Sequence, residues 1–137
     1  MLGSSLGGLI SFYIINNYSN YFGKAGFMSP SFWWNNKESL KEKINFSYSK
    51  IWLDGGTREG SNPQNMIDNI NLIYDNISKV KSNDVLKYIH ENAEHNEEAW
   101  ATRVHGPLIH FFGKEKDNNK KFDLIKRLMK LEEWGNL

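Results

Sequence analysis

The sequence predicts an α/β fold, in which the strands of a parallel sheet alternate with helices. Short apolar runs bounded by Gly or Pro are typical of buried strands. They alternate along the chain with longer segments whose apolar residues recur every three or four positions, as in helices. Because this alternation is typical of strands joined by crossover helices, we expect a parallel sheet. The 137 residues suffice for one such domain, and no internal repeat is visible.

The first half of the chain contains two of the predicted strands. Helical spacing of apolar residues predicts a helix over residues 6–18, which ends in a cluster of asparagines. Residues 24–29 are small or apolar and are closed by a proline, which predicts a buried strand. An aromatic loop over residues 30–37 and a short charged helix over 38–44 follow. The run at residues 50–54 predicts a second strand, broken by the two glycines after it.

The second half continues the alternation. A proline directly behind an asparagine cap predicts the start of a helix over residues 63–81. Alternating apolar residues predict a strand over 84–92. Residues 99–112 have helical spacing, with a kink or interruption expected at their Gly-Pro pair. A charged linker is expected over 114–121, and an amphipathic helix over 122–134.

Composition and charge exclude several function classes. The 17 Lys+Arg residues nearly balance the 16 Asp+Glu residues, so the chain lacks the basic field that nucleic-acid binding requires. Without cysteine there is no thiolate zinc site and no cysteine nucleophile, so any nucleophile must be an oxygen. The histidines form no H-E-x-x-H pattern, and we expect no metal.

The N-terminal residues give no targeting signal. They lack a basic region, and the apolar stretch over residues 9–15 is too short to span a bilayer. We therefore expect no membrane interaction. The compartment stays open, with the cytoplasm as the default expectation.

Residues Gly3-Ser4-Ser5-Leu6-Gly7 fit the G-x-S-x-G pattern of a nucleophile elbow. The pattern stands immediately before a predicted helix, as this motif requires. Small flanking residues allow the strand and helix to pack closely while the Ser5 hydroxyl stands clear. Alternatively, the glycines form a turn that simply starts a helix. A phosphate-binding loop is disfavoured because no Walker lysine follows the glycines.

An acid and then a histidine follow Ser5 in the chain, which is the order of the catalytic residues in enzymes with a nucleophile elbow. His95 lies in a loop between a predicted strand and a helix, where an imidazole can accept the serine proton. We expect the other histidines to be surface or packing residues; they are His90, His105 and His110. The acid is either Asp54, at the end of a strand, or Glu59, in the loop beyond it. The loop position favours Glu59.

Four segments together resemble the esterases of the α/β-hydrolase superfamily that include the esterase D, feruloyl esterase and enterochelin esterase groups. These segments are residues 3–11, 22–33, 51–59 and 93–100. The resemblance implies an α/β-hydrolase fold and a serine esterase that acts on a small-molecule ester without a cofactor. It implies residues 1–113 as the C-terminal portion of the esterase domain, followed by a linker and amphipathic helix over 114–137.

The same resemblance implies roles for individual residues. Ser5 corresponds to the nucleophile, Glu59 to the acid of a Gly-Thr-x-Asp/Glu pattern and His95 to the catalytic histidine. The backbone N–H of Leu6 would be one donor of the oxyanion hole. The second donor of such enzymes comes from a loop after an earlier strand, and only two residues precede the motif here.

We therefore expect the N-terminal half of the hydrolase fold to be absent, leaving the first strand with an open edge. The chain would then fold poorly, aggregate, form a homo-oligomer or need a complementary N-terminal fragment. The alternative to an esterase is an inactive remnant or interaction module with an incomplete oxyanion hole.

Two further groups of side chains are candidates for substrate contact. Trp33 and Trp34 could line an acyl or aryl pocket, or could cap the apolar surface. Arg58 and Arg103 could contact an anionic substrate, but we expect each to be a solvated surface charge.

Overall fold

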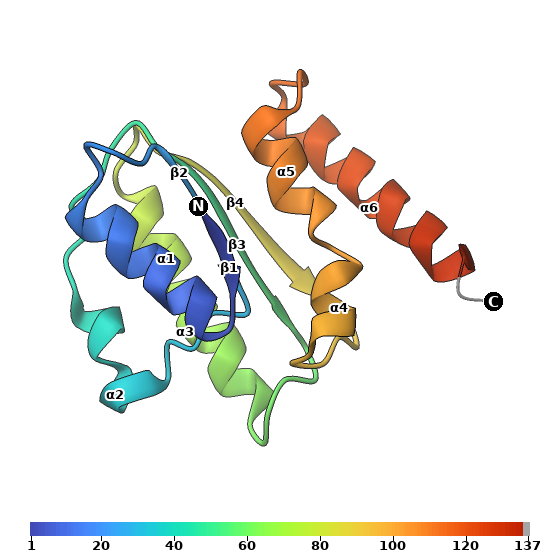
Figure 1. The fold of residues 1–137 in the computed structure, drawn as a ribbon, viewed down its shortest axis with the longest axis horizontal. Coiled ribbons are helices and arrows are strands. Elements are labelled where there is room, and N and C mark those ends of the chain that lie inside the picture. The colour runs from blue at the N-terminus through green and yellow to red at the C-terminus, as the bar shows by residue number, and fades with distance from the viewer. Residues whose placement is uncertain (136–137) are drawn as a thin grey trace.

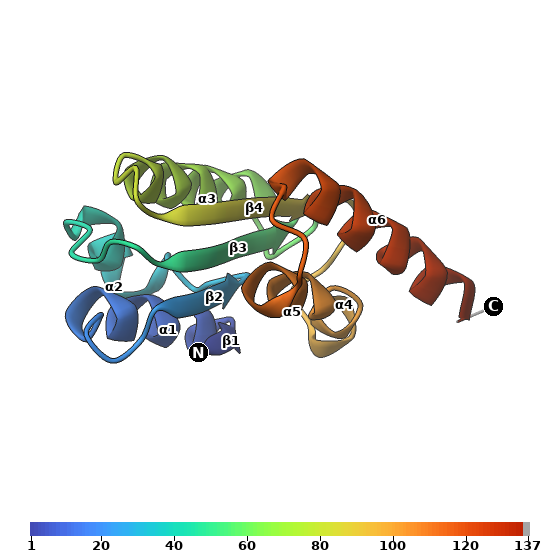
Figure 2. The same cartoon turned by 90° about the horizontal axis from the view of Figure 1, so that it is seen from above.

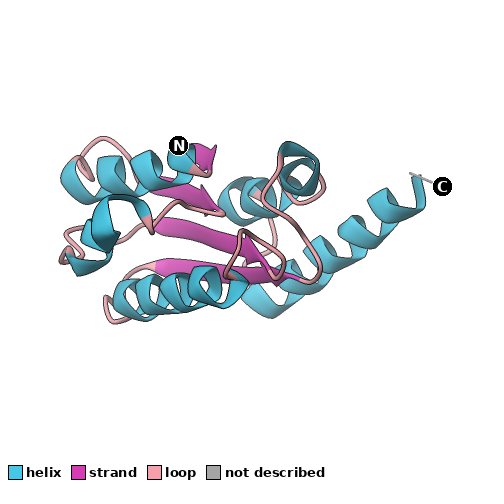
Figure 3. Cartoon of the chain, turned by 90° about the horizontal axis from the view of Figure 1, so that it is seen from below, coloured by secondary structure: helices cyan, strands magenta, loops and turns pink. Residues whose placement is uncertain are grey.

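The computed structural model describes the backbone of residues 1–135 and the side chains of residues 1–130. Its centre is a four-stranded parallel sheet in the order β1-β2-β3-β4. The strands are β1 (Leu2–Ser4), β2 (Lys24–Met28), β3 (Lys50–Gly56) and β4 (Asp84–His90). The α/β fold class predicted from the sequence is confirmed (Figure 3).

Helices cover both faces of this sheet, so the molecule has three layers (Figure 1). The helices of the first face are α1 (Leu6–Asn17) and α3 (Pro63–Ser78). The helices that follow β4 in the chain cover the opposite face. They are α4 (Glu97–Ala101), α5 (His105–Phe112) and α6 (Asn118–Gly135). The turn elements α2 (Trp34–Lys37) and η1, a 3₁₀ helix at Glu38–Lys41, lie between β2 and β3 in the sequence. Figure 2 shows the sheet between its helical layers from above.

Each face of the sheet has its own hydrophobic core. Phe27 and Leu53 point to the face covered by α1 and α3, where they pack with Phe12 and Ile70. Trp52, adjacent to Leu53, points to the opposite face and joins a cluster formed with residues of α5 and α6. Since successive side chains of a strand alternate between faces, a central strand covered on both sides has consecutive apolar residues, as β3 has at Ile51, Trp52 and Leu53.

Strand β3 is longer than the sequence predicts. The two glycines expected to break it are its last residues, Gly55 and Gly56. A Cβ at Gly55 would lie 2.4 Å from Ile70 Cδ1, and a Cβ at Gly56 would lie 2.2 Å from the Ala93 carbonyl oxygen. These glycines therefore allow neighbouring segments to approach the strand and do not interrupt it.

Other elements also differ in extent from their predictions. The segment 99–112 belongs to two helices, α4 and α5, and the break between them precedes Pro107, which lies in the first turn of α5. Proline is tolerated there because the first N–H groups of a helix lack partners within it. Helix α6 begins at Asn118, inside the expected linker. The predicted cap is present, since Asn62 Oδ1 accepts from the Asn65 N–H at 3.2 Å.

Four further expectations are met only in part or stay untested. The loop at 30–37 contains the short turn α2, and the charged helix at 38–44 is only the 3₁₀ turn η1. The side chains beyond residue 130 in the predicted amphipathic helix lie outside the described residues. The boundary between residues 1–113 and 114–137 stays a prediction.

Candidate active site

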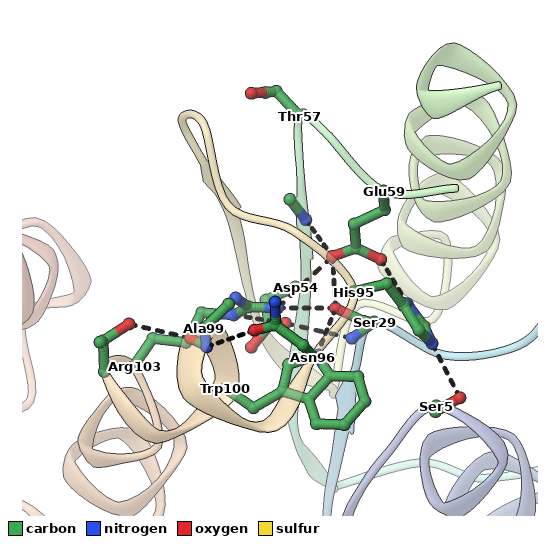
Figure 4. A network of polar contacts seen from close by, with 12 residues as sticks. Ser5, Ser29, Asp54, Thr57, Glu59, His95, Asn96, Ala99, Trp100 and Arg103 are labelled. Carbon is green, nitrogen blue, oxygen red and sulfur yellow. Dashed lines mark hydrogen bonds and ion pairs between the residues drawn. The ribbon is translucent and has the colours of Figure 1, made fainter. Parts of the chain in front are cut away.

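Each strand of the sheet leads, at its carboxyl end, into a segment that contributes one residue to a common polar cluster. Ser5 follows β1, Ser29 follows β2, Glu59 lies in the loop after β3, and His95 lies in the loop after β4. The carboxyl edge of a parallel sheet is where open α/β folds place their binding sites. Figure 4 shows this cluster with its hydrogen bonds and ion pairs.

Ser5 occupies a strained turn between β1 and α1. Its φ of 55° and ψ of −120° lie in a region that residues with a side chain rarely adopt. The Ser5 N–H donates to the Met28 carbonyl at 2.9 Å, and the Ser5 carbonyl accepts from the Ser31 N–H at 3.1 Å. The strained turn is therefore anchored to the end of β2 and the segment beyond it, which fixes the position of the Ser5 hydroxyl.

The glycines of the elbow are not equally constrained. A Cβ at Gly3 would lie 2.4 Å from the Gly7 carbonyl oxygen, so β1 and α1 can approach this closely only without it. A Cβ at Gly7 would have no neighbour within 4 Å. The expectation that small flanking residues permit close packing thus holds for Gly3, and not for Gly7.

His95 joins the serine and the acid. Its Nε2 lies 2.8 Å from Ser5 Oγ, and its Nδ1 lies 2.8 Å from Glu59 Oε2. An ionised carboxylate only accepts hydrogen bonds, so Nδ1 carries a proton toward Glu59 and the unprotonated Nε2 of the neutral ring accepts the Ser5 hydroxyl. The Glu59 side chain is 1% exposed and the His95 side chain 27% exposed. The imidazole is therefore open to a substrate while its acid partner is shielded.

The loops that carry Glu59 and His95 are tied together by backbone contacts. The Thr57 N–H donates to the His90 carbonyl and the Arg58 N–H to the Ala93 carbonyl, each at 3.0 Å. The Asn92 N–H donates to Thr57 Oγ1 at 2.7 Å. These bonds hold the loop after β3 against the loop after β4, and so set the distance between the acid and the imidazole.

Asp54, the other acid considered from the sequence, makes a different set of contacts. Its Oδ1 lies 3.0 Å from Arg103 Nε, and its Oδ2 accepts from Trp52 Nε1 at 2.6 Å. Burial raises the pKa of Asp54, and the positive charge of Arg103 opposes this rise. Glu59 is thus the acid beside His95, whereas Asp54 belongs to a buried ion pair.

The expectation that Arg103 is a solvated surface charge is wrong. Its side chain is completely buried between Asp54, Ser29 and Glu59. An available signal was the carboxylate of Asp54 within an otherwise apolar strand, because a buried charge needs a partner. Arg58 lies on the surface as expected, 3.7 Å from Glu94.

The two tryptophans line different hollows. Trp33 borders a hollow of about 290 Å³ that also contacts His95 and Glu59, and Asn65 and Met66 complete its lining together with residues 60–62. Trp34 borders a separate hollow of about 510 Å³ along α1. The structure therefore places Trp33, and not Trp34, at the hollow that contacts His95.

Leu6 is the first residue of α1, so its N–H is one of the four that lack an acceptor within the helix. The helix N-terminus behind Ser5 also favours negative charge. Within the described part of the chain, no group of three or more His, Asp or Glu side chains could hold a metal ion. Among these residues there is also no helix long and apolar enough to cross a membrane.

Comparison with known proteins identifies the family. The sequence pattern of the family described as "Putative esterase" matches residues 1–111. The chain belongs to this family. The chain is also similar to the "Uncharacterized protein YbbA" of Bacillus subtilis (strain 168), with 38% identity over 71 residues. The match covers 48% of this chain and 27% of that protein.

A solved structure shares the fold of this family member. The BES protein from Bacillus cereus superposes with a TM-score of 0.66 at 24% identity. The match covers 80% of this chain and 43% of the BES chain. This esterase-family chain therefore spans less than half the length of both relatives, and the likeness to the BES protein shows a shared α/β fold.

Proposed function

We propose that the chain is a serine carboxylesterase whose catalytic residues are Ser5, His95 and Glu59. The observation that carries the proposal is the continuous chain of contacts from Glu59 Oε2 through both nitrogens of His95 to Ser5 Oγ, each step 2.8 Å long. Membership of the esterase family supports the reaction class. The substrate proposed is a small-molecule carboxylic ester.

In the first half-reaction, Ser5 Oγ attacks the ester carbonyl carbon while His95 Nε2 removes the hydroxyl proton. Glu59 holds the Nδ1 proton and stabilises the imidazolium that forms. The carbonyl oxygen becomes an oxyanion, which the Leu6 N–H at the start of α1 stabilises. Collapse of the tetrahedral intermediate transfers the Nε2 proton to the leaving alcohol and leaves an acyl-enzyme at Ser5.

In the second half-reaction, His95 Nε2 removes a proton from water, which attacks the acyl carbon. The proton then returns to Ser5 Oγ as the carboxylic acid leaves. The hollow bordered by Trp33 adjoins His95 and provides room for an apolar group of the substrate. No step requires a metal or an organic cofactor.

The test is hydrolysis of a short p-nitrophenyl ester, combined with labelling by a fluorophosphonate and identification of the labelled residue by mass spectrometry. Ser5→Ala is expected to abolish labelling and to reduce the hydrolysis rate by about 10⁴-fold or more. Ser4→Ala is the matched control, because it removes the neighbouring hydroxyl and leaves the proposed triad intact. We expect this control to retain both ester hydrolysis and labelling by the fluorophosphonate.

A folded chain that neither hydrolyses the ester nor reacts with the fluorophosphonate would contradict the proposal. That result would favour the alternative of an inactive esterase-like remnant or interaction module. Labelling at a residue other than Ser5 would contradict the assignment of the nucleophile.

A further inference from the structure

A second polar network lies directly behind Glu59 and has no part in the mechanism above. Its central atom is the hydroxyl oxygen of Ser29, at the end of β2 (Figure 4). Ser29 is completely buried, and its φ of 42° is positive, a backbone conformation that favours glycine. Such a conformation persists only where the surroundings hold it, and it occurs mainly at functional sites.

The direction of each hydrogen bond at Ser29 follows from the chemistry of its partners. Arg103 Nη2 lies 2.6 Å and Trp100 Nε1 3.0 Å from Ser29 Oγ. Guanidinium and indole N–H groups can only donate, so these two bonds use both lone pairs of the hydroxyl oxygen. The hydroxyl proton is therefore directed to its third partner, Glu59 Oε1, at 2.5 Å.

These contacts fix the rotation of the Glu59 carboxylate. Oε1 accepts from Ser29 and from the Gly56 N–H, both at 2.5 Å, and lies 3.6 Å from Arg103 Nη2. Oε2 is left to face His95 Nδ1. Rotation of the carboxylate out of this plane would break these contacts and leave buried donors without an acceptor, which is costly.

We infer that Arg103 and Ser29 are positioning residues, which orient Glu59 so that its Oε2 holds His95 in the geometry required for attack by Ser5. This inference rests on the proposed function for its consequence in catalysis. Its structural content is independent of activity: the bond between Glu59 and His95 depends on the donors behind Glu59.

The guanidinium group of Arg103 suits this position better than an ammonium group would. Its Nε lies 3.0 Å from Asp54 Oδ1, its Nη1 donates to the Ala99 carbonyl at 3.0 Å, and its Nη2 donates to Ser29. A lysine supplies one compact charge at the end of a flexible chain and cannot reproduce this planar fork. Arg103→Lys thus keeps the charge that Asp54 needs and removes the directed donor to Ser29.

The test uses the downfield proton NMR signal of the hydrogen-bonded His95 Nδ1–H, which is assigned by its loss in His95→Gln. The variants are Arg103→Lys, Ser29→Ala and the surface control Arg58→Lys. Retention of folding is checked by near-UV circular dichroism. We expect the signal to shift or disappear in the first two variants and to stay unchanged in the control. If the unsubstituted chain is active, kcat should fall by about 100-fold in Arg103→Lys and in Ser29→Ala, with little change in KM, as for a misplaced catalytic group.

An unchanged signal in folded Arg103→Lys and folded Ser29→Ala would overturn the inference. If Arg103→Lys does not fold, Ser29→Ala decides the matter, because it leaves the pair of Arg103 and Asp54 in place. The NMR result needs no substrate, so its outcome is distinct from a failure of the proposed esterase activity. A chain without activity in which both variants lose the signal would refute the proposed function and support the positioning role.

Discussion

Trp33 and Trp34 are adjacent in the sequence, but their surroundings give them different expected roles. Their rings meet edge to face with centroids 6.1 Å apart, and only Trp33 borders the hollow beside His95. Trp33→Ala should raise KM for p-nitrophenyl esters with large acyl groups by roughly tenfold, equivalent to about 1.4 kcal/mol of lost apolar contact. Trp34→Ala is the matched control and should leave KM unchanged. Equal effects of the two substitutions would contradict this assignment of the substrate hollow.

At the scale of single residues, the sequence predicts positions where chemistry fixes both residue type and order. The pattern around Ser5 and the loop position of His95 are of this kind, and the structure brings these residues together with Glu59. Arg103 could not be assigned in this way, because its burial depends on Asp54, which is 49 residues away in the sequence. The strain at Ser29 is likewise invisible in a sequence that has an ordinary serine there.

At the scale of elements, the junction of β1 and α1 gives a prediction about the two glycines of the elbow. Gly3→Ala should reduce the free energy of unfolding by about 1–3 kcal/mol and lower activity, since the new Cβ would overlap the Gly7 carbonyl. Gly7→Ala should leave stability unchanged or raise it by up to about 1 kcal/mol, because its Cβ enters open space at the start of a helix. Urea unfolding of both variants checks this. A more stable Gly3→Ala variant would show that the close approach is not required.

The contact between α5 and β4 predicts a dependence of stability on pH. His110 is buried, and its Nε2 lies 3.1 Å from the Asp84 carbonyl oxygen. Burial lowers the pKa of His110 below 6.5, while Asp84 opposes this change and the charges of Lys121 and Lys50 add to it. Below pH 6.5 the unfolded chain then binds a proton that the folded chain does not, so stability falls as the pH decreases toward the folded-state pKa.

Replacement of this histidine isolates its contribution. Lowering the pH from 7.5 to 5.5 should reduce the free energy of unfolding less in His110→Gln than in the unsubstituted chain. The difference is the part of the pH dependence that comes from protonation of His110 in the unfolded state. The measurement is urea unfolding at the two pH values. Identical pH dependence in both proteins would mean that His110 is free to become protonated in the folded state.

Element boundaries were predicted well where a local signal marks them. The cap at Asn62 fixes the start of α3, and the spacing of apolar residues identifies α1. Boundaries set by packing were missed. The end of β3 depends on the close approach of Ile70 and Ala93 to its terminal glycines, and neither neighbour is apparent from the strand itself.

At the scale of the whole molecule, the β1 edge of the described sheet is unpaired beside an exposed apolar helix face. Among the described residues, β1 pairs only with β2, so the backbone groups on its other edge have no strand partner. Helix α1 is apolar on most of its surface, and three large apolar residues on it are about half exposed: Leu6, Ile10 and Tyr13. These side chains border the hollow of about 510 Å³. Unpaired edges and contiguous apolar surface are typical sites of association.

We therefore expect the purified chain to associate through this side, either with itself or with a complementary segment that adds a strand to β1. Light scattering after gel filtration should give a mass above the 16.0 kDa of one chain. Ile10→Lys should reduce association because it places a charge on the open face of α1. Leu72→Lys is the matched control, since Leu72 is 45% exposed on α3, compared with 51% for Ile10 on α1. A monomer that unfolds cooperatively and binds no apolar dye would contradict this expectation, because its open edge and apolar helix face would then be stable in water without a partner.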